Sequence, residues 1–123
     1  MPIKPILSKD VQKFLERFDH FKDGEFRSIE TPSPTTFTLT MAGQDSARGF
    51  DWLSVKFEFS GVSDAKLLAN EKLSMVDMND GINIICEDTK FLFCIGDYET
   101  VSGAKNSICF IESSSLKYQE LSF

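Results

Sequence analysis

The one histidine of the chain is the first residue to consider for catalysis. His20 stands among carboxylates at Asp19, Asp23 and Glu25, and an imidazole oriented by a carboxylate can act as a general base. A helix over this segment keeps His20 off its apolar face, so we expect the imidazole near the solvent-exposed helix end. There it simply suits the negative end of the helix dipole. We therefore expect no catalytic residue and a protein that is not an enzyme.

Metal and cofactor chemistry is also poorly supported by the residue spacings. A calcium loop ending at Gly81 and Glu87 would need oxygen ligands where Val76 and Met78 stand. The chain has three cysteines, which lack Cys-x-x-Cys spacing and lie in apolar runs, as buried packing thiols do. They are Cys86, Cys94 and Cys109. Glycine-rich phosphate-binding and esterase motifs do not occur in the sequence. We expect neither a metal ion nor another cofactor.

Length and composition bound the class of protein. The 123 residues, with 41% apolar residues and 12 phenylalanines, predict a single domain over 1–123 with a substantial core. A net charge of −6 argues against nucleic acid as a partner. The sequence contains no apolar run long enough to span a membrane. An odd number of cysteines and an N-terminus unlike a signal peptide favour a cytoplasmic location.

Apolar periodicity predicts one helix followed by strands. Val11, Phe14, Leu15, Phe18 and Phe21 form a helical stripe, which predicts a helix over about 9–21 with Ser8 as its N-cap. Alternating or continuous apolar runs then predict strands, with Asn79-Asp80-Gly81 as a hairpin turn. The sequence leaves 65–68 open between a helical turn and a strand, and it predicts loops at 43–49 and 96–103. The predicted strands lie at 26–29, 37–41, 53–59, 73–76, 82–86, 91–95, 108–111 and 116–123.

This order of elements predicts an α+β, mostly β fold. About seven or eight short antiparallel strands would curl into a sandwich or partial barrel, with the helix on one face or plugging one end. The runs 91–95 and 108–111 are apolar on both faces, so we expect central strands covered on both sides. A tight hairpin at 87–90 would place Cys86 opposite Phe91.

The acidic charge lies mainly in the β region. Residues 1–27 carry six basic and five acidic side chains, and residues 28–123 carry seven basic and fourteen acidic ones. If the turns gather at one end of the sheet, their carboxylates form an acidic rim that could steer a basic partner. The alternative is that aspartate simply favours turns. The rim residues would be Asp80, Glu87, Asp88, Asp97 and Glu99.

Two aromatic residues are out of phase with the strand that follows them. Leu53, Val55, Phe57 and Phe59 define the core face of that strand, so parity puts Phe50 and Trp52 on the opposite face. Either a bulge returns both rings to the core, or they stand in solvent beside the 43–49 loop. In the second case they are candidate anchors for a protein partner together with Arg48, because aromatic residues and arginine dominate interface hot spots.

A short motif suggests a family. The stretch Phe21-Lys22-Asp23-Gly24-Glu25, followed by a strand, resembles the opening of a group of small bacterial β proteins that includes immunity proteins of polymorphic toxin systems. The resemblance covers roughly residues 21–62, and Lys22 stands where the pattern has histidine. It implies a cytoplasmic, non-enzymatic protein that neutralises a partner by binding it.

The sequence therefore predicts a protein-binding module that uses an acidic rim and an aromatic patch, of the immunity or inhibitor kind. The alternative is a carrier for a small hydrophobic ligand, such as a lipid or an aromatic molecule, in a cavity lined by phenylalanines.

Overall fold

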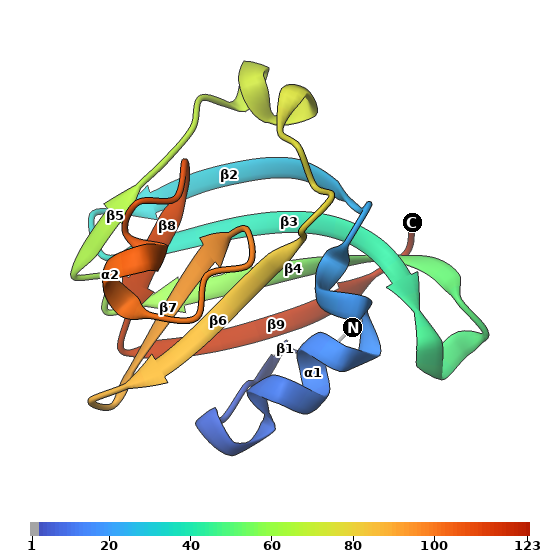
Figure 1. Ribbon diagram of the computed structural model, residues 1–123, viewed down its shortest axis with the longest axis horizontal. Helices are drawn as coiled ribbons and strands as arrows, with labels where there is room; N and C mark the ends of the chain where they lie inside the picture. Colours follow the sequence, from blue (N-terminus) through green and yellow to red (C-terminus); the bar gives the residue numbers. More distant parts are fainter. Residues whose placement is uncertain (1–2) are drawn as a thin grey trace.

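The computed structural model describes residues 3–123, which form two antiparallel sheets. The larger sheet has the order β1-β9-β4-β3-β2 and the smaller one β5-β8-β7-β6. The smaller sheet and helix α1 lie over one face of the larger sheet (Figure 1). The strands are β1 (Ile3–Pro5), β2 (Glu25–Ser33), β3 (Thr36–Asp45), β4 (Asp51–Ser60), β5 (Asp64–Lys66), β6 (Ile82–Glu87), β7 (Lys90–Ile95), β8 (Phe110–Ser113) and β9 (Ser115–Leu121).

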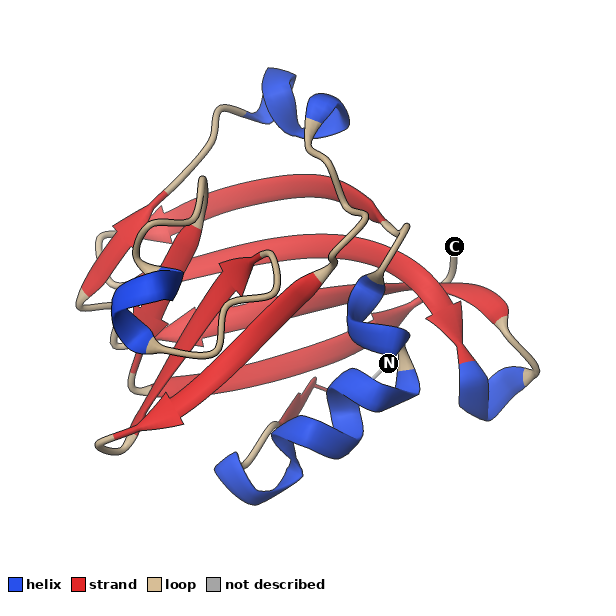
Figure 2. Cartoon of the chain, in the orientation of Figure 1, coloured by secondary structure: helices blue, strands red, loops and turns tan. Residues whose placement is uncertain are grey.

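Strands dominate the described chain, and its helices are short (Figure 2). The helices are η1 (Ser8–Asp10), α1 (Val11–Arg17), η2 (Asp19–Phe21), η3 (Ser46–Arg48), η4 (Asn70–Met75) and α2 (Val101–Ala104). Residues 3–123 form a sandwich of two open sheets rather than a closed barrel. The predicted α+β, mostly β class is confirmed.

The main core lies between the two sheets because the long strands alternate as the sequence predicts. Leu39, Met41, Val55, Phe57 and Phe59 are fully or almost fully buried on the inner face of the larger sheet. The Phe57 ring packs edge-on against Phe14 of α1, and the rings of Phe18 and Phe21, which follow α1, stack at 4.7 Å. Burial of this apolar surface is the main stabilising contribution to the fold.

A second, smaller core covers the outer face of the small sheet. Leu92, Cys94 and Phe110 pack there against Ala104 of α2, with Tyr98 at the margin. Strands β7 and β8 are therefore covered on both faces, as predicted. The run predicted at 108–111 is only partly a strand, because β8 begins at Phe110 and Ile108 is 49% exposed. The register predicted for the β6–β7 hairpin is also confirmed, with Cys86 opposite Phe91.

The predicted helix over 9–21 is too long. The α-helix itself spans Val11–Arg17, and Ser8 begins the preceding η1 instead of capping α1 with its side chain. After Phe18 the backbone turns left-handed, with φ of 51° to 56° at three successive residues, Asp19, His20 and Phe21. The apolar side chains of the predicted helix are nevertheless buried as predicted, because the left-handed turn still places the Phe21 ring against that of Phe18.

Four further local predictions need correction or completion. Residues 73–76 do not form a strand, because η4 occupies Asn70–Met75. The turn at Asn79-Asp80-Gly81 therefore joins η4 to β6 and closes no β-hairpin. The predicted 43–49 loop begins only after Asp45, where β3 ends. The open choice at 65–68 is decided in part, since β5 covers Asp64–Lys66.

Candidate functional site

An exposed aromatic patch lies at the end of the large sheet where β3 turns into β4. We define it as Phe50, Trp52, Phe123 and Arg27. Phe50 is 63% exposed and Trp52 is 39% exposed. The rings of Trp52 and Phe123 lie 5.5 Å apart, and the Arg27 guanidinium lies 4.4 Å from the centre of the Phe123 ring. The patch thus combines tryptophan, phenylalanine and a stacked arginine, the composition of interface hot spots.

The turn between β3 and β4 produces this exposure. The Asp45 side chain accepts a hydrogen bond from the Ala47 N–H, and the Asp45 carbonyl accepts one from the Phe50 N–H at 2.8 Å. Gly49 and Phe50 both adopt positive φ in this turn, and the Phe50 side chain is left exposed. Trp52 pairs with Gln44 in an uninterrupted register. Hence no bulge returns the two aromatics to the core, and the outward alternative of the sequence analysis is the one observed.

Sequence reasoning missed two members of the patch. Arg27 donates to the Ser54 hydroxyl from β2 and pairs with Glu25 at 2.9 Å, which holds its guanidinium over the outer face. Phe123 follows β9, whose pairing with β4 brings residue 121 opposite Ser54. Neither position carries a local signal, because only strand order places the ends of β2 and β9 beside Trp52.

Arg48 is not a member of the patch. Its guanidinium lies 3.5 Å from Asp45 and 3.6 Å from Glu120, so it belongs to an ionic cluster around the buried Asp45. Arg17 makes the central contacts of that cluster, donating to both Asp45 carboxylate oxygens at 2.8 and 2.7 Å and also to Glu120. The hydrogen bonds from Arg17 lower the pKa of the fully buried Asp45 and raise that of Arg17. This cluster fastens α1 to the end of the large sheet.

The five predicted rim carboxylates do not gather at one end of a sheet. Since Ile82 pairs with Ile95, Asp80 and Asp97 lie at one end of the β6–β7 hairpin, and Glu87 and Asp88 lie at its opposite end. Glu99 joins Asp97 along the hollow beside β6. The predicted single rim is therefore wrong, because one hairpin necessarily separates its turn from its open end.

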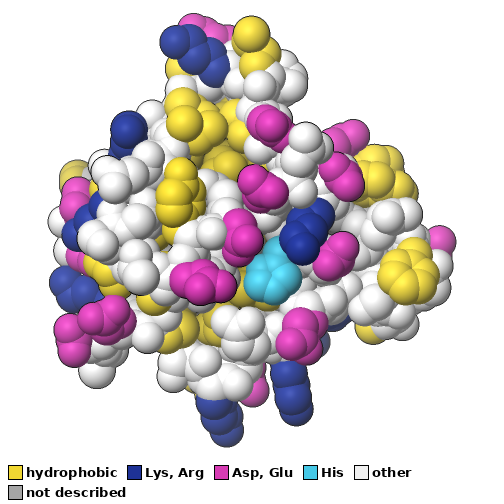
Figure 3. All heavy atoms as spheres, in the orientation of Figure 1, with side chains coloured by type: hydrophobic (Ala, Val, Ile, Leu, Met, Phe, Trp, Pro, Cys, Tyr) yellow, Lys and Arg dark blue, Asp and Glu magenta, His cyan; other side chains and the backbone are white. Residues whose placement is uncertain are grey.

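The acidic residues at the open end share a surface with the histidine. His20, Asp97 and Glu99 line one hollow of about 550 Å³, together with residues of α1 and β6. In the space-filling view, acidic side chains lie around the histidine, and a basic side chain lies directly beside it (Figure 3). The His20 Nδ1 lies 3.2 Å from the Ile82 carbonyl oxygen. The half-buried imidazole thus contacts β6, which corrects the expectation of a solvent-facing group at a helix end.

The cysteines differ from one another more than the sequence suggests. Cys94 and Cys109 are fully buried, but Cys86 is exposed at the end of β6. Burial raises the pKa of Cys109 to about 12, which leaves a protonated, unreactive thiol at neutral pH. The expectation of three buried packing thiols is therefore wrong for Cys86. Within residues 3–123 no group of three histidine, cysteine or carboxylate side chains has the geometry of a metal site.

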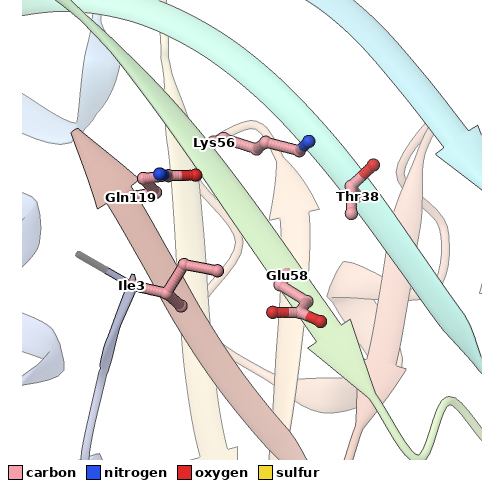
Figure 4. Close-up of a pocket in the computed structure, with 5 residues that line it drawn as sticks. All are labelled: Ile3, Thr38, Lys56, Glu58 and Gln119. Carbon is pink, nitrogen blue, oxygen red and sulfur yellow. The ribbon is translucent and has the colours of Figure 1, made fainter. Parts of the chain in front are cut away.

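A small hollow lies on the outer face of the large sheet (Figure 4). It measures about 130 Å³, below the roughly 300–1,000 Å³ of typical ligand pockets. Side chains of four strands line it, and Lys56 and Glu58 of β4 supply its charges. Its lining residues are Ile3, Thr38, Lys56, Glu58 and Gln119.

The phenylalanines form a packed core rather than the lining of a cavity. Rings of the helix and both sheets contact one another at centroid distances of 4.7 to 6.5 Å, as in the contacts of Phe57 with Phe14, Phe21 and Phe93. The hollows beside α1, β6 and η4 contain at most one phenylalanine each. This packing does not favour the alternative of a hydrophobic-ligand carrier.

Comparisons with protein-family models, with curated proteins and with solved structures found no match to this chain. In the described residues, none of the helices has the length and apolar character needed to cross a membrane. The chemistry of the exposed surfaces therefore carries the functional argument.

Proposed function

We propose that this protein is a non-enzymatic binding module that holds a protein partner, of the immunity or inhibitor kind that the sequence resemblance implies. The aromatic patch is the observation that supports this function. Phe50, Trp52 and Phe123 are 63%, 39% and 57% exposed within one patch, where a monomer gains nothing from leaving such rings in water. Tryptophan and arginine are the residues that most often anchor a protein interface.

The electrostatics of the chain indicate the charge of the partner. The net charge is −6, and the carboxylates of Asp97 and Glu99 border an open hollow on the surface. Complementary potentials accelerate association and exclude partners of the wrong sign. The partner of this module is therefore a basic protein, steered by the acidic surface and anchored on the aromatic patch.

The test compares Trp52→Ala with Met75→Ala in binding to a purified partner. The partner is isolated from cells of the source organism with the wild-type chain as bait, and its affinity is then measured by calorimetry. Trp52→Ala should weaken binding by about 2 kcal/mol or more, which is roughly thirtyfold. Met75 is 82% exposed on η4, outside the patch, so Met75→Ala should change the affinity less than about twofold.

The single tryptophan supplies an independent measurement. Because Trp52 is the only tryptophan in the chain, tryptophan emission of the module reports directly on the aromatic patch. Binding of a tryptophan-free fragment of the partner should shift this emission to shorter wavelength, because the ring loses its remaining water contact. An unchanged spectrum at saturation, together with equal affinities of the two variants, would refute the proposed anchor.

A further inference from the structure

Strand β6 is an edge strand whose outward backbone groups can be assigned from the register. The Gly96 N–H donates to the Gly81 carbonyl at 2.8 Å, so residues 81 and 96 form a hydrogen-bonded pair. Antiparallel pairing alternates, which turns the backbone groups of Asn83, Ile85 and Glu87 toward β7. The N–H and C=O groups of Ile82, Ile84 and Cys86 therefore point away from the sheet.

The contact of His20 with β6 agrees with this assignment, and it covers only the first of the three outward-facing residues. The His20 Nδ1 lies 3.2 Å from the carbonyl oxygen of Ile82, so this outward carbonyl has a side-chain partner. Within residues 3–123, none of the hydrogen bonds made by α1 or by the neighbouring loops reaches the outward groups of Ile84 or Cys86. These groups are free to pair with an added strand.

The other edges of the two sheets are interrupted, short or charged. The Asn70 side chain bonds both the N–H and the C=O of Ile29 at 2.9 Å, as a neighbouring strand would, and so caps the β2 edge at this residue. Register shifts interrupt β2 on both sides of it. The edge strands β1 and β5 have only three residues each, and they contain Pro5 in one case and the charged Asp64 and Lys66 in the other. Such devices are how proteins block unwanted strand pairing. Strand β6 has six residues in regular register and contains no proline, lysine or bulge.

A groove follows this open edge. The hollow of about 550 Å³ adjoins a second one of about 500 Å³, and Ser8 and Cys86 line both. The first is lined by the consecutive residues 83–86, whose side chains point to opposite faces of the sheet. It therefore runs along the backbone edge rather than over one face of the sheet. Val11 and Gln12 of α1 form its opposite wall.

The charge of the groove selects its occupant. Asp97 and Glu99 line the first hollow, and Glu87 and Asp88 line the second. Lys90 also borders the second hollow, but its ammonium lies 3.8 Å from Glu112. A second copy of this chain pairing through β6 would bring the same carboxylates together, and like charges repel. An extended segment that carries lysine or arginine fits both the backbone and the charges.

We propose that the β6 edge accepts a basic, extended segment of the protein partner as an added strand. This inference rests on the proposed function and names the class of partner that the acidic surface receives. Backbone bonds to Ile84 and Cys86 supply affinity for any strand, and the carboxylates select side chains that alternate between basic and apolar. The six residues of β6 set the length of the segment, about 20 Å of extended chain.

The test uses a synthetic eight-residue peptide that alternates lysine and valine, labelled with a fluorophore and titrated with the full chain. The matched control peptide alternates glutamate and valine. Two further lysine peptides carry N-methyl groups on alternate backbone nitrogens, one on the odd and one on the even positions. Only one of these two sets faces β6, so one peptide should bind at least about tenfold more weakly and the other within about twofold.

Variants of the chain test the same edge from the other side. Cys86→Pro removes an outward N–H at an exposed position, where an edge strand tolerates proline. Cys86→Ser keeps that N–H and serves as the control. Cys86→Pro should lower peptide affinity at least about tenfold, whereas Cys86→Ser should leave it within about twofold. As a measurement on the unaltered chain, saturation with peptide should slow hydrogen exchange at the Ile84 and Cys86 amides at least about tenfold.

Several results would overturn the inference. The first is that the lysine peptide does not bind at concentrations up to about 1 mM. The second is that the two methylation patterns weaken binding equally. The third is that Cys86→Pro and Cys86→Ser bind the peptide with equal affinity. Self-association that Cys86→Pro abolishes would also overturn it, because a second copy would then be the occupant. Trp52→Ala should leave peptide affinity unchanged. Failure at the β6 edge with an intact Trp52 effect on the whole partner therefore rejects this inference and leaves the proposed function standing.

Discussion

The buried carboxylate of Asp45 provides the sharpest test of the forces that hold this fold together. Its side chain is 0% exposed, and it accepts hydrogen bonds from Arg17 Nε at 2.8 Å, Arg17 Nη2 at 2.7 Å and the Ala47 N–H at 3.0 Å. Asp45→Asn keeps the shape but places an amide donor against the Arg17 donors. The change therefore removes the charge pairing while creating no cavity.

The size of the stability loss in Asp45→Asn depends on the contacts that Arg17 keeps. Breaking a buried ion pair by removing one partner costs about 3–5 kcal/mol. Arg17 is 22% exposed and keeps its contact with Glu120, so we expect the lower end of that range, about 3 kcal/mol. For a chain of this size, about 4 °C of melting temperature corresponds to 1 kcal/mol, which predicts a fall of about 12 °C.

Urea unfolding and thermal unfolding at pH 7 measure this effect, and Glu25→Gln is the matched control. Glu25 pairs with Arg27 at 2.9 Å with both side chains about a third or more exposed, so its loss should cost less than about 0.5 kcal/mol. A loss below about 1 kcal/mol for Asp45→Asn would contradict the reasoning, because it would mean that the cluster contributes no more than a surface pair.

The pH dependence checks the sign of the same interaction. Hydrogen bonding to Arg17 lowers the pKa of Asp45 in the folded state, so the unfolded chain takes up the proton first as pH falls. The stability that Asp45 contributes is complete above its ordinary pKa of about 3.9 and is lost as pH falls through the lower folded value. The difference in free energy of unfolding between the wild type and Asp45→Asn should be constant from about pH 5 to 8 and should shrink below about pH 4. A gap that widens on acidification would contradict this.

Three further predictions concern the backbone and the thiols. Asp19→Gly should raise the free energy of unfolding by about 0.5–1 kcal/mol in urea titrations, because glycine adopts the positive φ of 51° without strain; a loss of stability would show that the turn is relaxed. Gly81→Ala should be more destabilising than Gly49→Ala by at least about 1 kcal/mol. Both have positive φ, but a Cβ at 81 would clash with the backbone carbonyl of His20, whereas one at 49 meets open space. Iodoacetamide at pH 8.5 should modify Cys86 alone in the native protein, since Cys109 is buried with a pKa raised to about 12; mass spectrometry showing modified Cys109 would refute this.

The sequence predicts those parts of the fold that depend on local alternation. Phe57 and Phe59 face the core because their strand alternates regularly, and Cys86 lies opposite Phe91 because a short hairpin fixes its own register. The left-handed turn at 19–21 could not be predicted. The helical stripe is satisfied by either backbone path, and only the tertiary contact of Phe21 with Phe18 distinguishes them.

The candidate site could be predicted only in part, because local alternation places some of its residues and tertiary contacts place the others. Parity alone separates Trp52 from the core face of β4, but Phe123 and Arg27 reach the patch through pairing between strands distant in sequence. Its proximity in sequence predicts Arg48 as a member of the patch. In the structure it turns to Asp45, because a buried carboxylate recruits nearby cations more strongly than an exposed ring does.

The position of β9 has consequences for folding. Strand β9 lies between β1 and β4, so residues 115–121 insert into the middle of the larger sheet rather than adding to its side. During synthesis, the edge of β4 that pairs with β9 therefore stays unpaired until residues 115–121 have left the ribosome. The pairing of Ile3 with Gln119 closes the longest loop within residues 3–123, which slows folding and lengthens this exposure. Ribosome-bound chains that stop before β9 should accordingly be the species that depends most on chaperones.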